Sequence, residues 1–94
     1  MRRDPLTTPP RLPRPAADLV GRTYYIPPDL VQYERAGFVV RLTEVREDIS
    51  LWYGGVWVWI EGVQLDAQGD ALAWVQALIH VDALGETTRL DGGV

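Results

Sequence analysis

His80 is the only histidine and Ser50 the only serine in this chain of 94 residues, and the two are the pair that a hydrolytic site would need. A hydrolytic site would use Ser50 as nucleophile and His80 as base, with Asp48 or Asp82 orienting the imidazole. Nothing in their spacing requires this arrangement, and the Gly-x-Ser-x-Gly pattern of a nucleophile elbow is absent. We therefore predict no catalytic residues and a protein that is not an enzyme.

The composition also argues against a metal site or a cofactor. The chain has no cysteine, which excludes disulfides and thiolate ligands, and a single histidine makes a structural zinc site improbable. Asp66, Gln68 and Asp70 have the alternate spacing of a calcium loop, but Ala71 and Ala77 stand where the loop needs glycine and a closing carboxylate. Gly-rich phosphate loops are also missing. The sequence predicts no metal and no cofactor.

The segment from Ile49 to Ile60 places two runs of β-favouring residues around Gly54-Gly55, which predicts a β-hairpin. Because strand side chains alternate between faces, the hairpin would separate aliphatic residues from tryptophans. The first face would carry Ile49, Leu51, Tyr53, Val56, Val58 and Ile60, and the second Ser50, Trp52, Trp57 and Trp59. Asp48 and Glu61 would then oppose each other as like charges, so we expect the hairpin to fray there.

The rest of the body is expected to form a strand at 21–26, a short helix or structured loop near 29–36, a strand at 38–45 and a strand at 71–82. A four-residue turn from Asp66 to Gly69 would pair Leu65 with Asp70. The aliphatic odd-numbered residues of the last strand would then lie beside Val58 and Ile60. All four tryptophans would share the opposite side of the sheet, called here the Trp face (Trp52, Trp57, Trp59 and Trp74).

The predicted fold class is all-β, a small antiparallel barrel of four to five strands. A first strand, a longer loop at 27–37 and a meander of three to four strands resemble an SH3-like barrel in fold pattern. An OB-like barrel and an open twisted sheet are the alternatives. The resemblance includes no family motif, so it assigns no functional residue.

Charge and proline divide the chain into an arm and a body. Residues 1–16 carry four arginines and one aspartate, a net charge of +3, whereas residues 17–94 carry five arginines and twelve carboxylates, a net charge of −7. Five of the seven prolines lie in the arm, which favours an extended polyproline II conformation. We expect a disordered basic arm at 1–16, a β-barrel domain at 17–90 and a frayed end at 91–94.

All nine basic residues are arginine, and with the abundant alanine, glycine, valine and proline this usage indicates a GC-rich bacterial genome. No apolar run approaches the ~18 residues of a membrane span, and the N-terminus lacks the apolar region of a secretory signal. The expected location is the cytoplasm, with no membrane partner.

Tryptophan and arginine anchor protein interfaces, and a large exposed apolar face usually marks a contact. We therefore expect a protein-interaction or assembly module that binds a protein partner or a second copy of itself as a homodimer. The candidate binding residues are Trp52, Trp57, Trp59, Trp74, Glu61 and Gln76, and the candidate arm contacts are Arg11, Pro13 and Arg14. The alternative is that the tryptophans pack internally as a second minor core.

Two further hypotheses involve the arm. Its arginines could contact the phosphates of a nucleic acid, but the acidic body would repel that backbone, so nucleic acid is the less favoured partner. The segment from Pro9 to Pro15 could also dock on the Trp face, since aromatic grooves bind polyproline II segments, with its arginines paired to Glu61 and other carboxylates.

Overall fold

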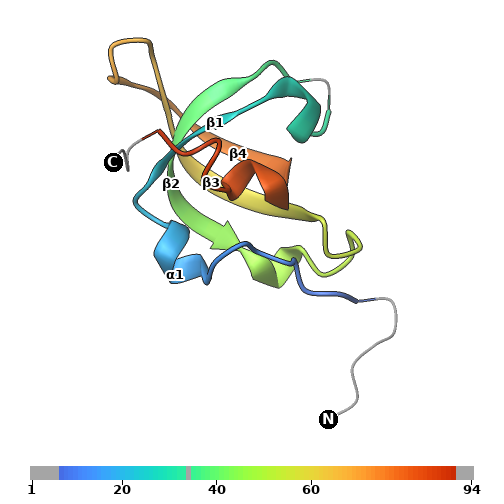
Figure 1. Ribbon diagram of the computed structural model, residues 1–94. Helices are drawn as coiled ribbons and strands as arrows, with labels where there is room; N and C mark the ends of the chain where they lie inside the picture. The colour runs from blue at the N-terminus through green and yellow to red at the C-terminus, as the bar shows by residue number, and fades with distance from the viewer. Residues whose placement is uncertain (1–6, 34, 91–94) are drawn as a thin grey trace.

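Four antiparallel strands form a single sheet in the computed structural model, which describes residues 7–33 and 35–90 (Figure 1). The strands are neighbours in the order β1-β2-β3-β4, so the chain is a simple meander. The elements in chain order are α1 (Ala16–Leu19), β1 (Thr23–Ile26), the 3₁₀ turn η1 (Pro28–Leu30), β2 (Phe38–Arg46), η2 (Glu47–Ile49), β3 (Trp57–Leu65), β4 (Ala71–His80) and η3 (Val81–Leu84). The predicted all-β class with little helix is confirmed.

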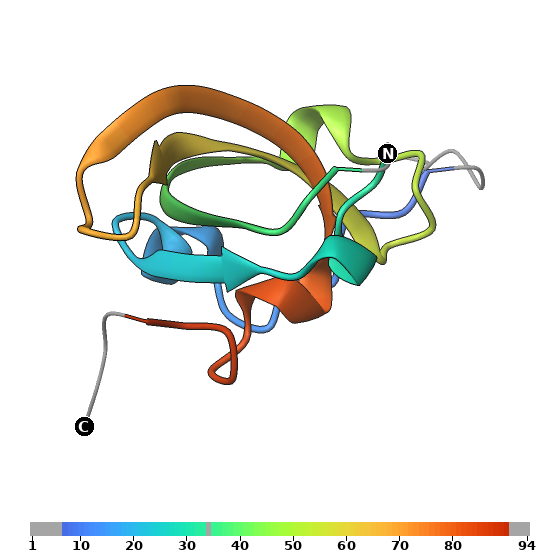
Figure 2. The ribbon, with the colours of Figure 1, turned by 90° about the horizontal axis from the view of Figure 1, so that it is seen from above.

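The sheet curls strongly but does not close into a barrel (Figure 2). β1 and β4 are its two outer strands and are not hydrogen-bonded to each other. The structured loop expected near 29–36 contains η1 and then reaches the outer edge of β4. There Val31 forms an isolated bridge with Ile79, and the Gln32 N–H donates to the Leu78 carbonyl at 2.9 Å. The closed SH3-like barrel is therefore not confirmed, and the observed form is the open twisted sheet.

The outer edge of β1 is covered by the chain that follows η3. The Tyr25 N–H donates to the Thr88 carbonyl at 2.9 Å, and the Leu90 N–H donates to the Thr23 carbonyl at 2.8 Å. These bonds use backbone groups that an uncovered edge strand would present to solvent. The C-terminal segment thus lies beside the first strand, far from it in sequence (Figure 1).

The hydrophobic core fills the inner face of the curled sheet. Alternate residues of the strands point into it because strand side chains change face at every residue. The inner-face core residues of β2, β3 and β4 are Phe38, Val40, Leu42, Val58, Ile60, Val75, Ala77 and Ile79, each no more than 5% exposed. Leu19 of α1 and Leu84 of η3 complete the same cluster, so these short turns cover the open side of the core.

The predicted hairpin around Gly54-Gly55 is wrong. Residues 50–56 form a series of turns, and β3 pairs with β2 through Val45 to Ile60 and Arg46 to Trp59. A strand has only two edges, and β2 and β4 occupy both edges of β3, so no edge remains for residues 49–53. The two glycines do adopt positive φ values of 70° and 83°, but inside this longer connection.

The turn between β3 and β4 is one residue longer than predicted. Leu65 pairs with Ala71 rather than with Asp70, which leaves residues 66–70 as the loop. The Asp66 carboxylate accepts hydrogen bonds from the Gln68 and Asp70 N–H groups, both at 2.9 Å, and so holds the longer loop together. The aspartate that resembles a calcium ligand in the sequence closes a turn.

A β-bulge restores the predicted faces beyond this turn. Leu72 is an extra residue between the pairs Leu65–Ala71 and Gln64–Ala73. The longer loop and the bulge each shift the pairing by one residue, and two shifts preserve the alternation of faces. The aliphatic stripe of β4 therefore lies beside Val58 and Ile60 as predicted, although every pair beyond the bulge is displaced by two residues.

Candidate functional site

The tryptophans of the expected Trp face do not form one continuous cluster. Trp57 and Trp59 project from the outer face of β3, where their partners on β4 are His80 and Leu78. Trp74 is on the same face but opposite Val63, so it lies about 13 Å further along the sheet than Trp59. Trp52 belongs to the connection between β2 and β3.

The tryptophans also differ in exposure. Trp52 and Trp74 are each 61% exposed, whereas Trp57 and Trp59 are partly buried. Trp57 makes an edge contact with the His80 ring at 5.2 Å between centroids, and Trp59 Nε1 donates to the Tyr53 hydroxyl at 3.2 Å. Trp57 and Trp59 therefore contact neighbouring side chains and are also partly exposed on the surface.

Ser50 and His80 have separate structural partners. Ser50 is fully buried, and its hydroxyl donates to the Arg46 carbonyl at 2.6 Å and accepts from the Trp59 N–H at 2.9 Å. His80 Nδ1 accepts from the Asp82 N–H at 3.1 Å. The Ser50 hydroxyl thus accepts a backbone N–H near the start of β3. The residue pattern did not indicate this role.

An aromatic groove lies where the 27–37 loop meets the outer face. Tyr33 stacks on Trp59 with ring centroids 6.5 Å apart and planes inclined by 22°. The groove has a volume of about 290 Å³ and is lined by Gln32, Tyr33, Arg35, Trp59, Gln76, Ala77 and Leu78. It combines one aromatic wall with amide and guanidinium donors, so it suits an apolar side chain flanked by hydrogen-bond acceptors.

Tyr33 occupies this groove in an uncommon backbone conformation. Its φ of 69° is in the left-handed region, which L-residues with a bulky side chain rarely adopt, and the residue is 73% exposed. The Val31–Ile79 bridge holds the preceding residues against β4. Strained residues of this kind tend to occur at functional sites.

Arg35 supports the other end of the loop. Its guanidinium lies 4.5 Å from the centre of the Phe38 ring, and Nη2 donates to Gln64 Oε1 at 3.4 Å. Its buried Nε has no hydrogen-bond partner among the described residues. Tyr33, Arg35 and Gln32 were not among the predicted site residues. The sequence places Tyr33 and Arg35 in the expected loop near 29–36 but carries no signal that this loop reaches Trp59.

Arg46 forms ion pairs with Asp48 and Glu61, the two carboxylates that the predicted hairpin placed opposite each other. Its guanidinium donates to Glu61 at 2.7 Å and to both oxygens of Asp48 at 3.1 and 3.0 Å, with Glu44 at 3.9 Å. The hydrogen bond from Arg46 lowers the pKa of Asp48 below its ordinary 3.8, and the bonds to Asp48 and Glu61 raise the pKa of Arg46. The predicted binding residue Glu61 therefore already has a cationic partner, and Gln76 lies directly across from it on β4.

The described part of the arm runs along the connection between β2 and β3. The Thr8 N–H donates to the Leu51 carbonyl at 2.7 Å, and the Arg11 N–H donates to the Gly55 carbonyl at 2.8 Å. Arg11 Nη2 also reaches the Gly54 carbonyl at 3.4 Å. A Cβ at Gly55 would lie 3.0 Å from Arg11 Nε, so glycine permits this close approach.

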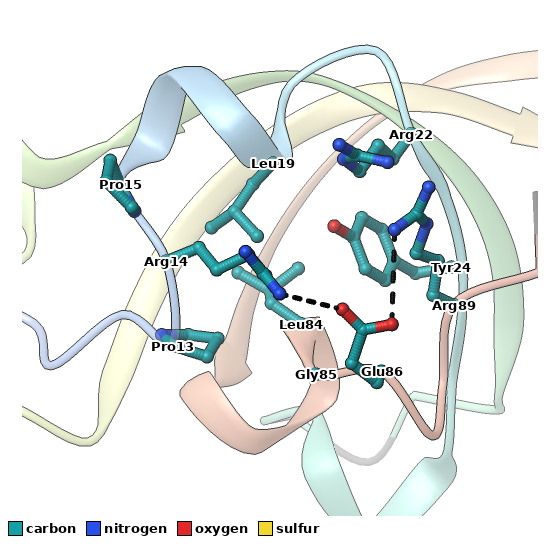
Figure 3. Close-up of a pocket in the computed structure, with 10 residues that line it drawn as sticks. All are labelled: Pro13, Arg14, Pro15, Leu19, Arg22, Tyr24, Leu84, Gly85, Glu86 and Arg89. Atoms are coloured by element: carbon teal, nitrogen blue, oxygen red, sulfur yellow. Dashed lines mark hydrogen bonds and ion pairs between the residues drawn. The ribbon is translucent and has the colours of Figure 1, made fainter. Parts of the chain in front are cut away.

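Pro13 and Arg14 border a second hollow on another side of the molecule, where Arg14 forms an ion pair with Glu86 at 3.3 Å (Figure 3). The arm contacts of the structure thus join Arg11 to the 50–56 connection and Arg14 to Glu86, while Glu61 is paired with Arg46. The division into a disordered arm, a domain and a frayed end stays a prediction. Residues 1–6 and 91–94 of that division lie outside the described residues.

Comparison of the chain with protein-family models, with curated proteins and with solved structures finds no match. Within residues 7–33 and 35–90, no group of three or more histidine and carboxylate side chains is placed to hold a metal ion. No helix in this part of the chain has the length and apolar content that crossing a membrane requires.

Proposed function

We propose that this protein is a non-catalytic interaction module that binds a protein partner in the groove between Tyr33 and Trp59. The observation that carries the proposal is Tyr33 itself. The residue is 73% exposed, its backbone has a positive φ, and its ring stacks on Trp59. An exposed aromatic side chain buries much area on binding and loses little conformational entropy, and Trp59 supports Tyr33 from below.

The surroundings of the groove favour a protein over a nucleic acid. Bases stack on aromatic rings, but phosphates need free cations nearby. Arg35 is the single arginine among the groove residues, and the adjacent Arg46 is neutralised by three carboxylates. In the arm, Arg11 and Arg14 already contact the body. Binding through the arm to a nucleic acid is the alternative, and its affinity would fall steeply with added salt.

We also propose that the fold is an SH3-like variant whose barrel is incomplete. The 3₁₀ turn η3 follows β4, and residues 88–90 then pair with β1, which supports a fifth short strand. The loop at 27–37 and the meander agree with the same pattern. A fold likeness alone carries no function, so the proposed activity depends on the groove. Hydrogen exchange tests the fold: the Tyr25 and Leu90 amides should be protected.

An affinity pull-down from source-cell lysate tests the groove. The wild-type protein should retain a partner that Tyr33→Ser loses, because the variant removes the exposed half of the aromatic pair. Leu72→Ser is the matched control, since Leu72 is 58% exposed and lies outside the groove residues. Equal recovery of the same proteins by Tyr33→Ser and the control would contradict the proposal.

Self-association is tested separately by sedimentation of the purified protein over a range of concentrations. A dimer that dissociates in Tyr33→Ser but persists in Leu72→Ser would identify the partner as a second copy of the chain. A dimer unaffected by both changes would place the self-interface outside the groove.

A further inference from the structure

A second pocket, away from the aromatic groove, brings together three arginines from distant parts of the chain. Arg14 comes from the arm, Arg22 from the turn before β1, and Arg89 from the segment after η3 (Figure 3). These are three of the seven arginines among the described residues, in a chain whose net charge is −4. The pocket has a volume of about 500 Å³, within the range of small-molecule sites.

The floor of this pocket is apolar and belongs to the core. Leu19, Tyr24 and Leu84 line it and are each no more than 2% exposed. Pro13 and Pro15 of the arm add a wall of rigid rings (Figure 3). Because these floor residues are packed in the core, the floor of the pocket is formed by the fold itself.

The charges around the pocket are unbalanced. Glu86 is the one carboxylate among the lining residues, and it pairs with Arg14 at 3.3 Å and with Arg89 at 4.0 Å. Arg22 forms no ion pair with a described carboxylate, and its Nε donates to the Asp18 backbone carbonyl. Among the residues that line the pocket, three guanidinium groups stand against one carboxylate, so this lining carries more positive than negative groups above an apolar floor.

We propose that this pocket binds a small organic anion, with a phosphate or carboxylate group on a flat apolar body. Guanidinium groups present forked N–H donors that match both anions, and the apolar floor would cover the body of the ligand. The Glu86 carboxylate pairs with Arg14 and Arg89 and so competes with a bound anion for these two arginines. Its removal should therefore strengthen binding.

Titration of the ¹⁵N-labelled full-length protein with phenyl phosphate, followed by NMR, tests the site. We expect saturable shifts of the Leu84, Gly85 and Glu86 amides and no such shifts with benzyl alcohol, which lacks the charge. Parallel titrations with benzoate and inorganic phosphate distinguish a carboxylate from a phosphate preference and measure the contribution of the ring. Absence of saturable shifts with both phenyl phosphate and benzoate would overturn the proposal.

Substitutions that should change the affinity for phenyl phosphate in opposite directions distinguish binding from a purely structural role. Arg22→Gln should weaken phenyl phosphate binding about ten-fold or more, because a hydrogen bond to a charged group is lost. Glu86→Gln should tighten binding, whereas Arg41→Gln, an exposed arginine of β2 outside the pocket, should leave it unchanged. Arg14→Gln provides the same loss test if Arg22→Gln does not fold.

The proposal fails if Arg22→Gln or Arg14→Gln binds phenyl phosphate as tightly as Arg41→Gln does. It also fails if Glu86→Gln binds more weakly than the wild type. The second result would mean that the arginines and Glu86 serve only to attach the arm to the C-terminal segment.

Discussion

The inner and outer faces of this sheet differ sharply although their residues alternate along the same strands. On β3, Val58 and Ile60 are fully buried, while Trp57 and Trp59, which alternate with them, remain partly exposed. The curl of the sheet (Figure 2), α1 and η3 cover the inner face, whereas the outer face is met only locally, by Tyr33 and by Tyr53 at Trp59 among the described residues. The size and apolarity of a side chain therefore do not decide its burial here. The elements that cover each face do.

The largest expected effect separates the two faces directly. Ile60→Ala should lower the free energy of unfolding by about 2–5 kcal/mol, because it leaves a cavity in a closed core. Trp74→Ala removes a larger side chain but should cost less than about 1 kcal/mol, since Trp74 is mostly in solvent. Urea denaturation measures both. Equal losses would mean that the outer face is a second core.

A medium effect is expected where the outer face is joined to the connection before β3. Ser50→Ala should cost about 1–3 kcal/mol, because the Trp59 N–H loses its buried acceptor. Thr43→Ala is the matched control: the Thr43 hydroxyl also makes a hydrogen bond, to the Glu61 carbonyl, but it is exposed. Thermal unfolding should show a clearly lower midpoint for the serine variant only. Equal midpoints would show that the hydrogen bond from Trp59 to Ser50 does not stabilise the protein.

The smallest expected effect is a pH dependence at the edge of the outer face. Arg46 lowers the pKa of Asp48 below 3.8, so this contact stabilises the protein above that pH and is lost as the pH falls through the folded-state pKa. Asp48→Asn should flatten the acid side of the stability curve. Glu47→Gln removes a neighbouring exposed carboxylate outside the Arg46 cluster and should not. A curve unchanged by Asp48→Asn would show that the contact contributes nothing to stability.

The alternation of residues predicted the two faces better than it predicted their pairing. The aliphatic stripe of β4 and its neighbours on β3 could be assigned from sequence, because a register slip of one residue would expose the stripe. The displacement by two residues could not, since two compensating irregularities, the longer turn at Asp66 and the bulge at Leu72, leave the faces unchanged.

The groove was only half predictable. Trp59 and Gln76 were expected on one face from their positions in the strands. Tyr33 and Arg35 reach the groove because the 27–37 loop bridges to β4, and a bridge between segments so distant in sequence leaves no local pattern. The hairpin at Gly54-Gly55 was wrong for the related reason that local turn signals do not reveal which strand edges are already occupied.

By itself, the sequence determined the all-β class, the aliphatic core and the concentration of positive charge in the arm, because these follow from composition and from residues close together in the chain. The tertiary structure alone decided which segments cover the strand edges, that Arg46 stands between Asp48 and Glu61, and that Arg14, Arg22 and Arg89 share one pocket. Those arrangements depend on contacts between residues far apart in sequence. Such contacts form only when the sheet curls and brings the arm, η3 and the C-terminal segment to the same side of the core.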